Sequence, residues 1–168
     1  MARKVILYIA MSLDGYIAKH DDNIDFLSAV EAKDEDYGHA DFLHNIDTVI
    51  WGRRTLDKVL SFGEGVPYKD KLVYVISKRR TGKEEHAVYT DDLVGLIQEL
   101  KSNPGRDIYC DGGGEIVFEL LQQRLLDMVI PICLGTVFAS LEMAGQSSPY
   151  CSKKVFPSLR VLYSCGMR

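Results

Sequence analysis

Short apolar runs alternate with amphipathic stretches along most of this 168-residue chain, and this alternation limits the folds that it can adopt. The runs expected to form strands are residues 4–10, 47–51, 72–76, 86–89, 107–110, 128–134 and 159–165. Several of them are apolar almost throughout, which is typical of strands covered on both faces. Strands that alternate with helices indicate βαβ units, so the sequence predicts an α/β fold with a mainly parallel sheet.

The stretches between the strands have helical patterns. We expect helices at residues 34–45, 54–60, 91–101 and 115–124. In the third of these, Leu93, Ile97 and Leu100 recur at helical spacing. Thr90, Asp91 and Asp92 at its beginning suit a cap and the helix dipole, and the segment Asn103-Pro104-Gly105 is expected to end it.

Composition excludes several classes of protein. A net charge of −4 argues against a dedicated nucleic-acid binder. No apolar run approaches the roughly 20 residues that span a membrane, and the first run is short for a secretory signal. We therefore expect a cytoplasmic protein with reduced cysteines. The cysteines and histidines lack metal-ligand spacing, so no metal site is expected.

Charge is unevenly distributed along the chain. Residues 1–50 contain ten acidic and four basic side chains, whereas residues 51–90 contain nine basic and five acidic ones. A locally basic middle indicates either an anionic ligand or a solvated, lysine-rich surface.

Polar clusters follow four of the expected strands, at residues 12–16, 52–55, 77–80 and 111–115. In a parallel sheet, ligands bind outside the carboxyl ends of the strands. We therefore expect all four clusters to share one edge of the sheet.

Gly112, Gly113 and Gly114 precede an expected helix. Glycines let a ligand approach the backbone, and the N–H groups of a helix N-terminus favour a phosphate. A tight turn without a ligand is the alternative. The run does not match G-x-G-x-x-G, so the Rossmann dinucleotide fingerprint is not met.

The segment Gly52-Arg53-Arg54-Thr55 repeats this strand–glycine–helix arrangement and adds two guanidinium groups, which bind phosphate well. Solvated surface arginines are the alternative interpretation. Ser77, Lys78, Arg79 and Arg80 follow the next strand. If the two strands are neighbours, these cations converge with Arg53 and suit the 2′-phosphate that distinguishes NADPH from NADH.

Two carboxylates are candidates for orienting a substrate or assisting protonation. Asp14 lies in the turn-like segment Ser12-Leu13-Asp14-Gly15, and Asp25 lies in Asn23-Ile24-Asp25-Phe26. Each also suits an ordinary turn or surface position.

Together, these segments resemble the dihydrofolate reductase-like reductases, in particular the small bacterial branch related to the riboflavin-biosynthesis reductase (RibD C-terminal) domain. The matching segments are SLDGYIA at 12–18, DTVIWGRRT at 47–55, YVIS at 74–77 and GGGE at 112–115. The resemblance implies a single domain with a three-layer α/β/α fold. Its central sheet would be mainly parallel, with antiparallel C-terminal strands.

The resemblance also implies NADPH as the hydride donor. Gly52, Arg53, Arg54 and Thr55 would hold phosphates, and Ser77 with Lys78 or Arg79 would flank the 2′-phosphate. Gly112, Gly113, Gly114 and Glu115 would cradle the pyrophosphate, while Ala10 and the loop ending at Ile17 would border the nicotinamide. Homodimers are common in this branch.

The sequence thus predicts an NADPH-dependent reductase of a small heterocycle, either pteridine-like or the ribosylaminopyrimidine of riboflavin biosynthesis. The alternative is a nucleotide-binding protein or sensor without turnover.

Overall fold

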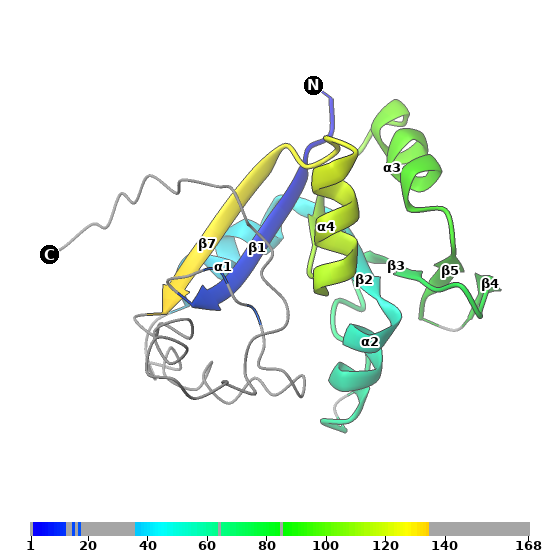
Figure 1. The fold of residues 1–168 in the computed structure, drawn as a ribbon, viewed down its shortest axis with the longest axis horizontal. Helices are drawn as coiled ribbons and strands as arrows, with labels where there is room; N and C mark the ends of the chain where they lie inside the picture. The colour runs from blue at the N-terminus through cyan, green and yellow to red at the C-terminus, as the bar shows by residue number, and fades with distance from the viewer. Residues whose placement is uncertain are drawn as a thin grey trace, which may run out of the picture.

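A computed structural model describes residues 2–12, 15, 17, 36–63, 65–84 and 86–134, with the side chains of Cys133 and Leu134 excepted. These residues form a seven-stranded sheet with the order β4-β5-β3-β2-β6-β1-β7 (Figure 1). The strands are β1 (Val5–Ser12), β2 (Ile46–Gly52), β3 (Leu72–Ile76), β4 (Gly82–Lys83), β5 (Val88–Thr90), β6 (Asp107–Cys110) and β7 (Met128–Leu134).

Every neighbouring pair in this sheet is parallel except β4 and β5. The predicted α/β fold with a mainly parallel sheet is confirmed. The last described strand, β7, pairs in parallel with β1 from Ile6–Met128 to Ser12–Leu134, so the expected antiparallel part does not include it. The expected strand at residues 159–165 lies outside the described residues.

Four helices within the described residues cover the two faces of the sheet: α1 (His39–His44), α2 (Arg53–Leu60), α3 (Leu93–Ser102) and α4 (Gly114–Gln122). Helices α3 and α4 pack on one face, against Leu7, Ile50 and Ile108. Helices α1 and α2 pack on the other, around Trp51 and Tyr109. Because successive residues of a strand point to opposite faces, apolar strands supply both cores. This gives the three layers that the resemblance implied.

The helix expected from residue 34 begins later, at His39. Gly38 has φ 77° and Tyr37 has φ 53°, and this left-handed backbone cannot continue an α-helix. Helix α3 follows its prediction closely, because the Asp92 side chain accepts a hydrogen bond from the N–H of Gly95. The two-residue strand β4 has no apolar pattern and was not predicted.

The amino-end edge of the sheet is tied together by Arg3, which is buried. Its guanidinium donates to Thr48 Oγ1 at 2.7 Å, to the carbonyl of Arg106 at 2.6 Å and to Asp47, with which it forms an ion pair. Asp47 also accepts from the N–H of Arg106 at 2.7 Å. These contacts join β2 to the turn before β6, at the edge opposite the polar clusters.

Candidate functional site

The described residues of the four polar clusters lie at one edge of the sheet, as predicted. Strands β1, β6, β2 and β3 are consecutive neighbours and run in the same direction. Their carboxyl ends therefore lie on one side of the molecule, and the first turns of α2 and α4 follow from two of them (Figure 1).

Two glycine loops form the centre of this edge. The N–H of Gly52 donates to the carbonyl of Gly112 at 2.8 Å, which joins the end of β2 to the loop after β6. Gly52 is the N-cap of α2 and Gly113 is the N-cap of α4, and neither helix start is capped by a side chain. The peptide bond between Gly112 and Gly113 is cis, and Gly112 has φ 102°. The predicted loops thus place two helix N-termini side by side.

These loops leave little room for side chains. A Cβ at Gly52 would lie 3.3 Å from Ile116 Cγ1, and one at Gly113 would lie 3.1 Å from Thr55 Oγ1. Both distances are shorter than ordinary carbon contacts. Thr55, in the first turn of α2, therefore lies directly against the triple-glycine loop.

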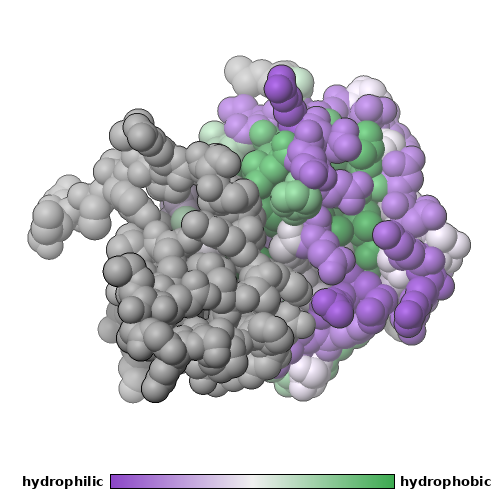
Figure 2. All heavy atoms as spheres, in the orientation of Figure 1, coloured by the Kyte–Doolittle hydropathy of each residue, from purple (hydrophilic) through white to green (hydrophobic). Residues whose placement is uncertain are grey.

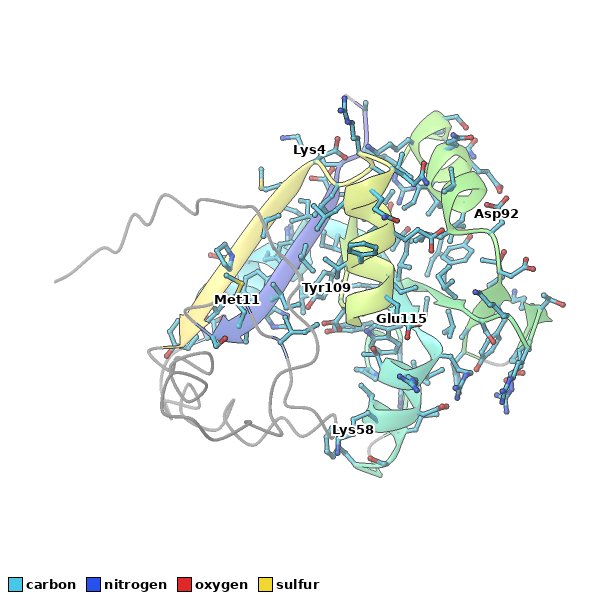
Figure 3. All side chains as sticks on the ribbon, viewed as in Figure 1. Lys4, Met11, Lys58, Asp92, Tyr109 and Glu115 are labelled. Carbon is cyan, nitrogen blue, oxygen red and sulfur yellow. The ribbon has the colours of Figure 1, made fainter. Side chains whose placement is uncertain are left out.

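The two arginines of α2 have different partners. Arg53 forms an ion pair with Asp57, one turn further along the same helix. Arg54 Nη1 lies 3.9 Å from Glu115 Oε1, so this exposed ion pair connects the first turns of α2 and α4. Figure 3 shows Glu115 at the end of α4 nearest α2. Solvent-exposed ion pairs contribute little stability, so these side chains can change partner at low cost.

The Ser77 cluster lies beside the α2 loop. Gly52 pairs with Ile76 in the sheet, so Arg53 and Ser77 directly follow the ends of two neighbouring strands, β2 and β3. Ser77 is buried, and its Oγ accepts from the N–H groups of Arg79 and Arg80, each at 3.2 Å.

Lys78 and Arg79 are exposed, while the Arg80 guanidinium lies 5.7 Å from the centre of the Tyr89 ring. Figure 2 shows hydrophilic residues gathered over the end of the sheet where β4 and β5 lie. The predicted cations Lys78 and Arg79 are thus exposed to solvent directly after β3, whereas the Arg53 guanidinium is paired with Asp57.

The residues predicted to border a nicotinamide lie at and beyond the end of β1. Ala10 is half-buried in β1, and the half-buried Ile17 packs against the α3–α4 core. The N–H of Gly15 donates to the carbonyl of Ser12 at 3.0 Å. Asp14 and Asp25 lie outside the described residues.

The structure adds a carboxylate that was not predicted as a site residue. Asp111, between β6 and Gly112, is half-buried and accepts three hydrogen bonds. The donors are Trp51 Nε1 at 2.8 Å, the Tyr68 hydroxyl at 3.1 Å and the Tyr109 hydroxyl at 2.6 Å. Burial raises the pKa of Asp111, and the three donors partly oppose this effect. A perturbed pKa at the edge where parallel sheets generally bind their ligands is a signal of a functional site.

Neither a metal site nor a membrane-spanning helix is found in the described part of the chain. No group of three His, Cys, Asp or Glu side chains among those residues could hold a metal ion. None of the helices seen there has the length and apolar character to cross a membrane.

Comparison with known proteins connects this geometry to a family. Residues 3–148 match the model of the RibD C-terminal domain. This match continues beyond the quoted motifs, which end at Glu115. In Bacillus subtilis (strain 168), Uncharacterized protein YwjB is 39% identical over 148 residues, and the match covers 81% of each chain. Uncharacterized protein YyaP of the same organism is 30% identical over 152 residues, and the match covers 79% of this chain and 77% of that protein.

Solved structures give the same result. A putative riboflavin biosynthesis protein from Shewanella sp. PV-4 is 35% identical, with a TM-score of 0.65 over 79% of this chain and 78% of that one. Dihydrofolate reductase from Enterococcus faecalis, complexed with NADP(H), is 13% identical, with a TM-score of 0.58 over 82% and 76%. The last similarity concerns the fold alone.

Proposed function

This chain belongs to the RibD C-terminal domain family, and we propose that it is an NADPH-dependent reductase that transfers a hydride to a small heterocyclic substrate. NADPH would supply the hydride, and the protein would hold the two reactants in position. The single observation that carries the proposal is the pair of adjacent helix starts joined by the bond from Gly52 to Gly112.

Such a pair suits a pyrophosphate. The first N–H groups of a helix lack partners within the helix, and the positive end of its dipole attracts anions. Here Gly112, Gly113 and Gly114 would admit the phosphates close to the backbone of α4, and Glu115 would follow them. Gly52, Arg53, Arg54 and Thr55 would hold phosphates from the side of α2. Arg54 could exchange Glu115 for phosphate, since both side chains are exposed.

The cations after β3 support NADPH rather than NADH. Ser77 organises the turn that carries Lys78 and Arg79, which are exposed beside the exit of β2. We propose that these two cations flank the 2′-phosphate of the adenosine ribose. NADH lacks this phosphate and would lose their attraction.

The substrate is proposed from the relatives and from the fold. The Shewanella protein bears the description putative riboflavin biosynthesis protein, which favours 5-amino-6-(5-phosphoribosylamino)uracil over dihydrofolate or another pteridine. We further propose that Ala10 and Ile17 border the nicotinamide, that Asp14 or Asp25 contacts the heterocycle, and that the protein acts as a cytoplasmic homodimer.

A screen of NADPH oxidation tests the activity. The purified protein is mixed with NADPH and, in turn, with 5-amino-6-(5-phosphoribosylamino)uracil, dihydrofolate and other pterins, while the absorbance of the dihydronicotinamide is followed. We expect loss of absorbance with the phosphoribosylaminouracil. Tight NADPH binding without oxidation in every mixture would contradict a reductase and favour a binding protein or sensor.

A further inference from the structure

The carboxyl group of Asp111 has hydrogen-bonding partners for two protonation states. The Tyr109 hydroxyl has one proton but two acceptors within reach, the carbonyl of Tyr8 at 3.3 Å and Asp111 Oδ1 at 2.6 Å. Both contacts are satisfied at once if Asp111 carries a proton and donates it to Tyr109, which then donates to Tyr8. If Asp111 is ionised, Tyr109 turns its proton to the carboxylate.

Side chains from two other segments of the chain donate hydrogen bonds to the second oxygen of the Asp111 carboxyl group. Trp51 Nε1 in β2 and the Tyr68 hydroxyl both donate to Asp111 Oδ2. These bonds fix the direction of the carboxyl group and stabilise its ionised form. Hence both oxygens of Asp111 keep hydrogen-bonding partners in either protonation state.

Asp111 also lies at the carboxyl end of a sheet strand, where a group that acts on a bound ligand is expected. It follows β6 directly and precedes Gly112, so it shares one turn with the proposed phosphate loop. Its donors Trp51 and Tyr109 belong to the core beneath α1 and α2, which places Asp111 on that face of the sheet. Crevices at the carboxyl ends of strands are where α/β proteins bind their ligands.

We propose that Asp111 is the acid that stores and supplies the proton consumed by the reduction, an inference that rests on the proposed hydride transfer. When a hydride adds to the carbon of a C=N or C=O bond, the displaced electron pair moves to the nitrogen or oxygen, which then needs a proton. The O–H bond of Asp111 breaks and the new N–H or O–H bond forms. The resulting carboxylate is stabilised by its three donors, and water returns the proton.

Burial of Asp111 favours its protonated form over its charged form. Burial raises its pKa, and burial also raises the pKa of the neighbouring Tyr109 and Tyr68 hydroxyls, so both stay protonated donors. The titratable groups around it among the described residues are Tyr8 of β1, His39 of α1, Tyr68, and Tyr109 and Cys110 of β6. Of these, only His39 belongs to a residue type that ordinarily titrates near neutral pH.

The first test needs no cofactor or substrate. Trp51 is the only tryptophan, and its indole N–H contacts Asp111, so its fluorescence reports the charge of that carboxyl group. We expect a fluorescence titration with a midpoint above the ordinary aspartate value of about 3.9. It should be absent in Asp111→Asn and retained in His39→Gln. A step that persists in Asp111→Asn, or that is lost in His39→Gln, would overturn the proposal.

A second variant keeps the carboxyl group and tests its chemistry. Tyr68→Phe removes one donor to the ionised form, so the midpoint of the Trp51 titration should move to higher pH. An unchanged midpoint would contradict the proposed network. This variant also serves if Asp111→Asn does not fold.

Kinetics then separate this inference from the proposed function. With NADPH and 5-amino-6-(5-phosphoribosylamino)uracil, wild-type kcat should fall as pH rises through the Trp51 midpoint, because the acid must be protonated. In Asp111→Asn, kcat should be lower by on the order of 100-fold and lose that pH dependence. Turnover with the same pH profile in both proteins would overturn the role of Asp111 alone. Absence of turnover in wild type would instead overturn the proposed function.

Discussion

At the scale of single residues, the proposed site depends on one glycine, Gly112, whose backbone other residues adopt only with strain. Gly112 has φ 102°, where an L side chain is strained, although nothing lies within 4 Å of the position that a Cβ would take. The strain at Gly112 is therefore a matter of backbone conformation and not of space.

Gly112→Ala tests this requirement. The strained backbone should lower the free energy of unfolding by about 1–3 kcal/mol, measured by urea denaturation. Gly63→Ala is a matched control, because Gly63 has φ 82°, also lacks neighbours within 4 Å and lies in the turn after α2. Both variants should lose similar stability, but only Gly112→Ala should weaken NADPH binding. Equal NADPH affinity in the two variants would contradict the proposed role of the loop.

Asp111 shows what sequence reasoning misses at this scale. The glycine and arginine segments can be recognised in the sequence because they follow the expected strands in short runs. The partners of Asp111, by contrast, come from positions 51, 68 and 109, and only the fold brings them together. An acidic residue directly between an apolar strand and a glycine run was the one available signal.

At the scale of elements, the apolar patterns predicted most strands and helices because each core strand is buried on both faces. The differences have local causes. Helix α1 begins at His39 because Tyr37 and Gly38 are left-handed. Strand β4 is defined by its pairing with β5, because its own residues, Gly82 and Lys83, have no apolar pattern that predicts a strand.

Arg3 provides a prediction about how elements are joined. In Arg3→Met, Asp47 would lose its ion pair while remaining half-buried, and the free energy of unfolding should fall by about 2–4 kcal/mol in urea denaturation. Lys4→Met, at the exposed neighbouring position, should change it by less than about 0.5 kcal/mol. A similarly small change for both variants would mean that the Arg3 contacts do not join the strands.

At the scale of the whole molecule, the contacts that join the strands and the residues of the proposed binding site lie at opposite edges of the sheet. Arg3 ties the amino ends of the strands, whereas the glycine loops, the cations after β3 and Asp111 lie at the carboxyl ends. The parallel order of β3, β2, β6 and β1 produces this separation. It was predictable from the sequence, because parallel strands bring the residues that follow them to one edge.

The central claim is that this edge binds a phosphorylated dinucleotide, and cofactor titration tests it most directly. NADPH and NADH are titrated by calorimetry into wild type and into Arg79→Ala, at one fixed ionic strength because exposed charges are screened by salt. We predict that wild type binds NADPH at least about tenfold more tightly than NADH, a difference of about 1.4 kcal/mol, and that Arg79→Ala reduces this preference. Equal affinity of wild type for the two cofactors would contradict the account.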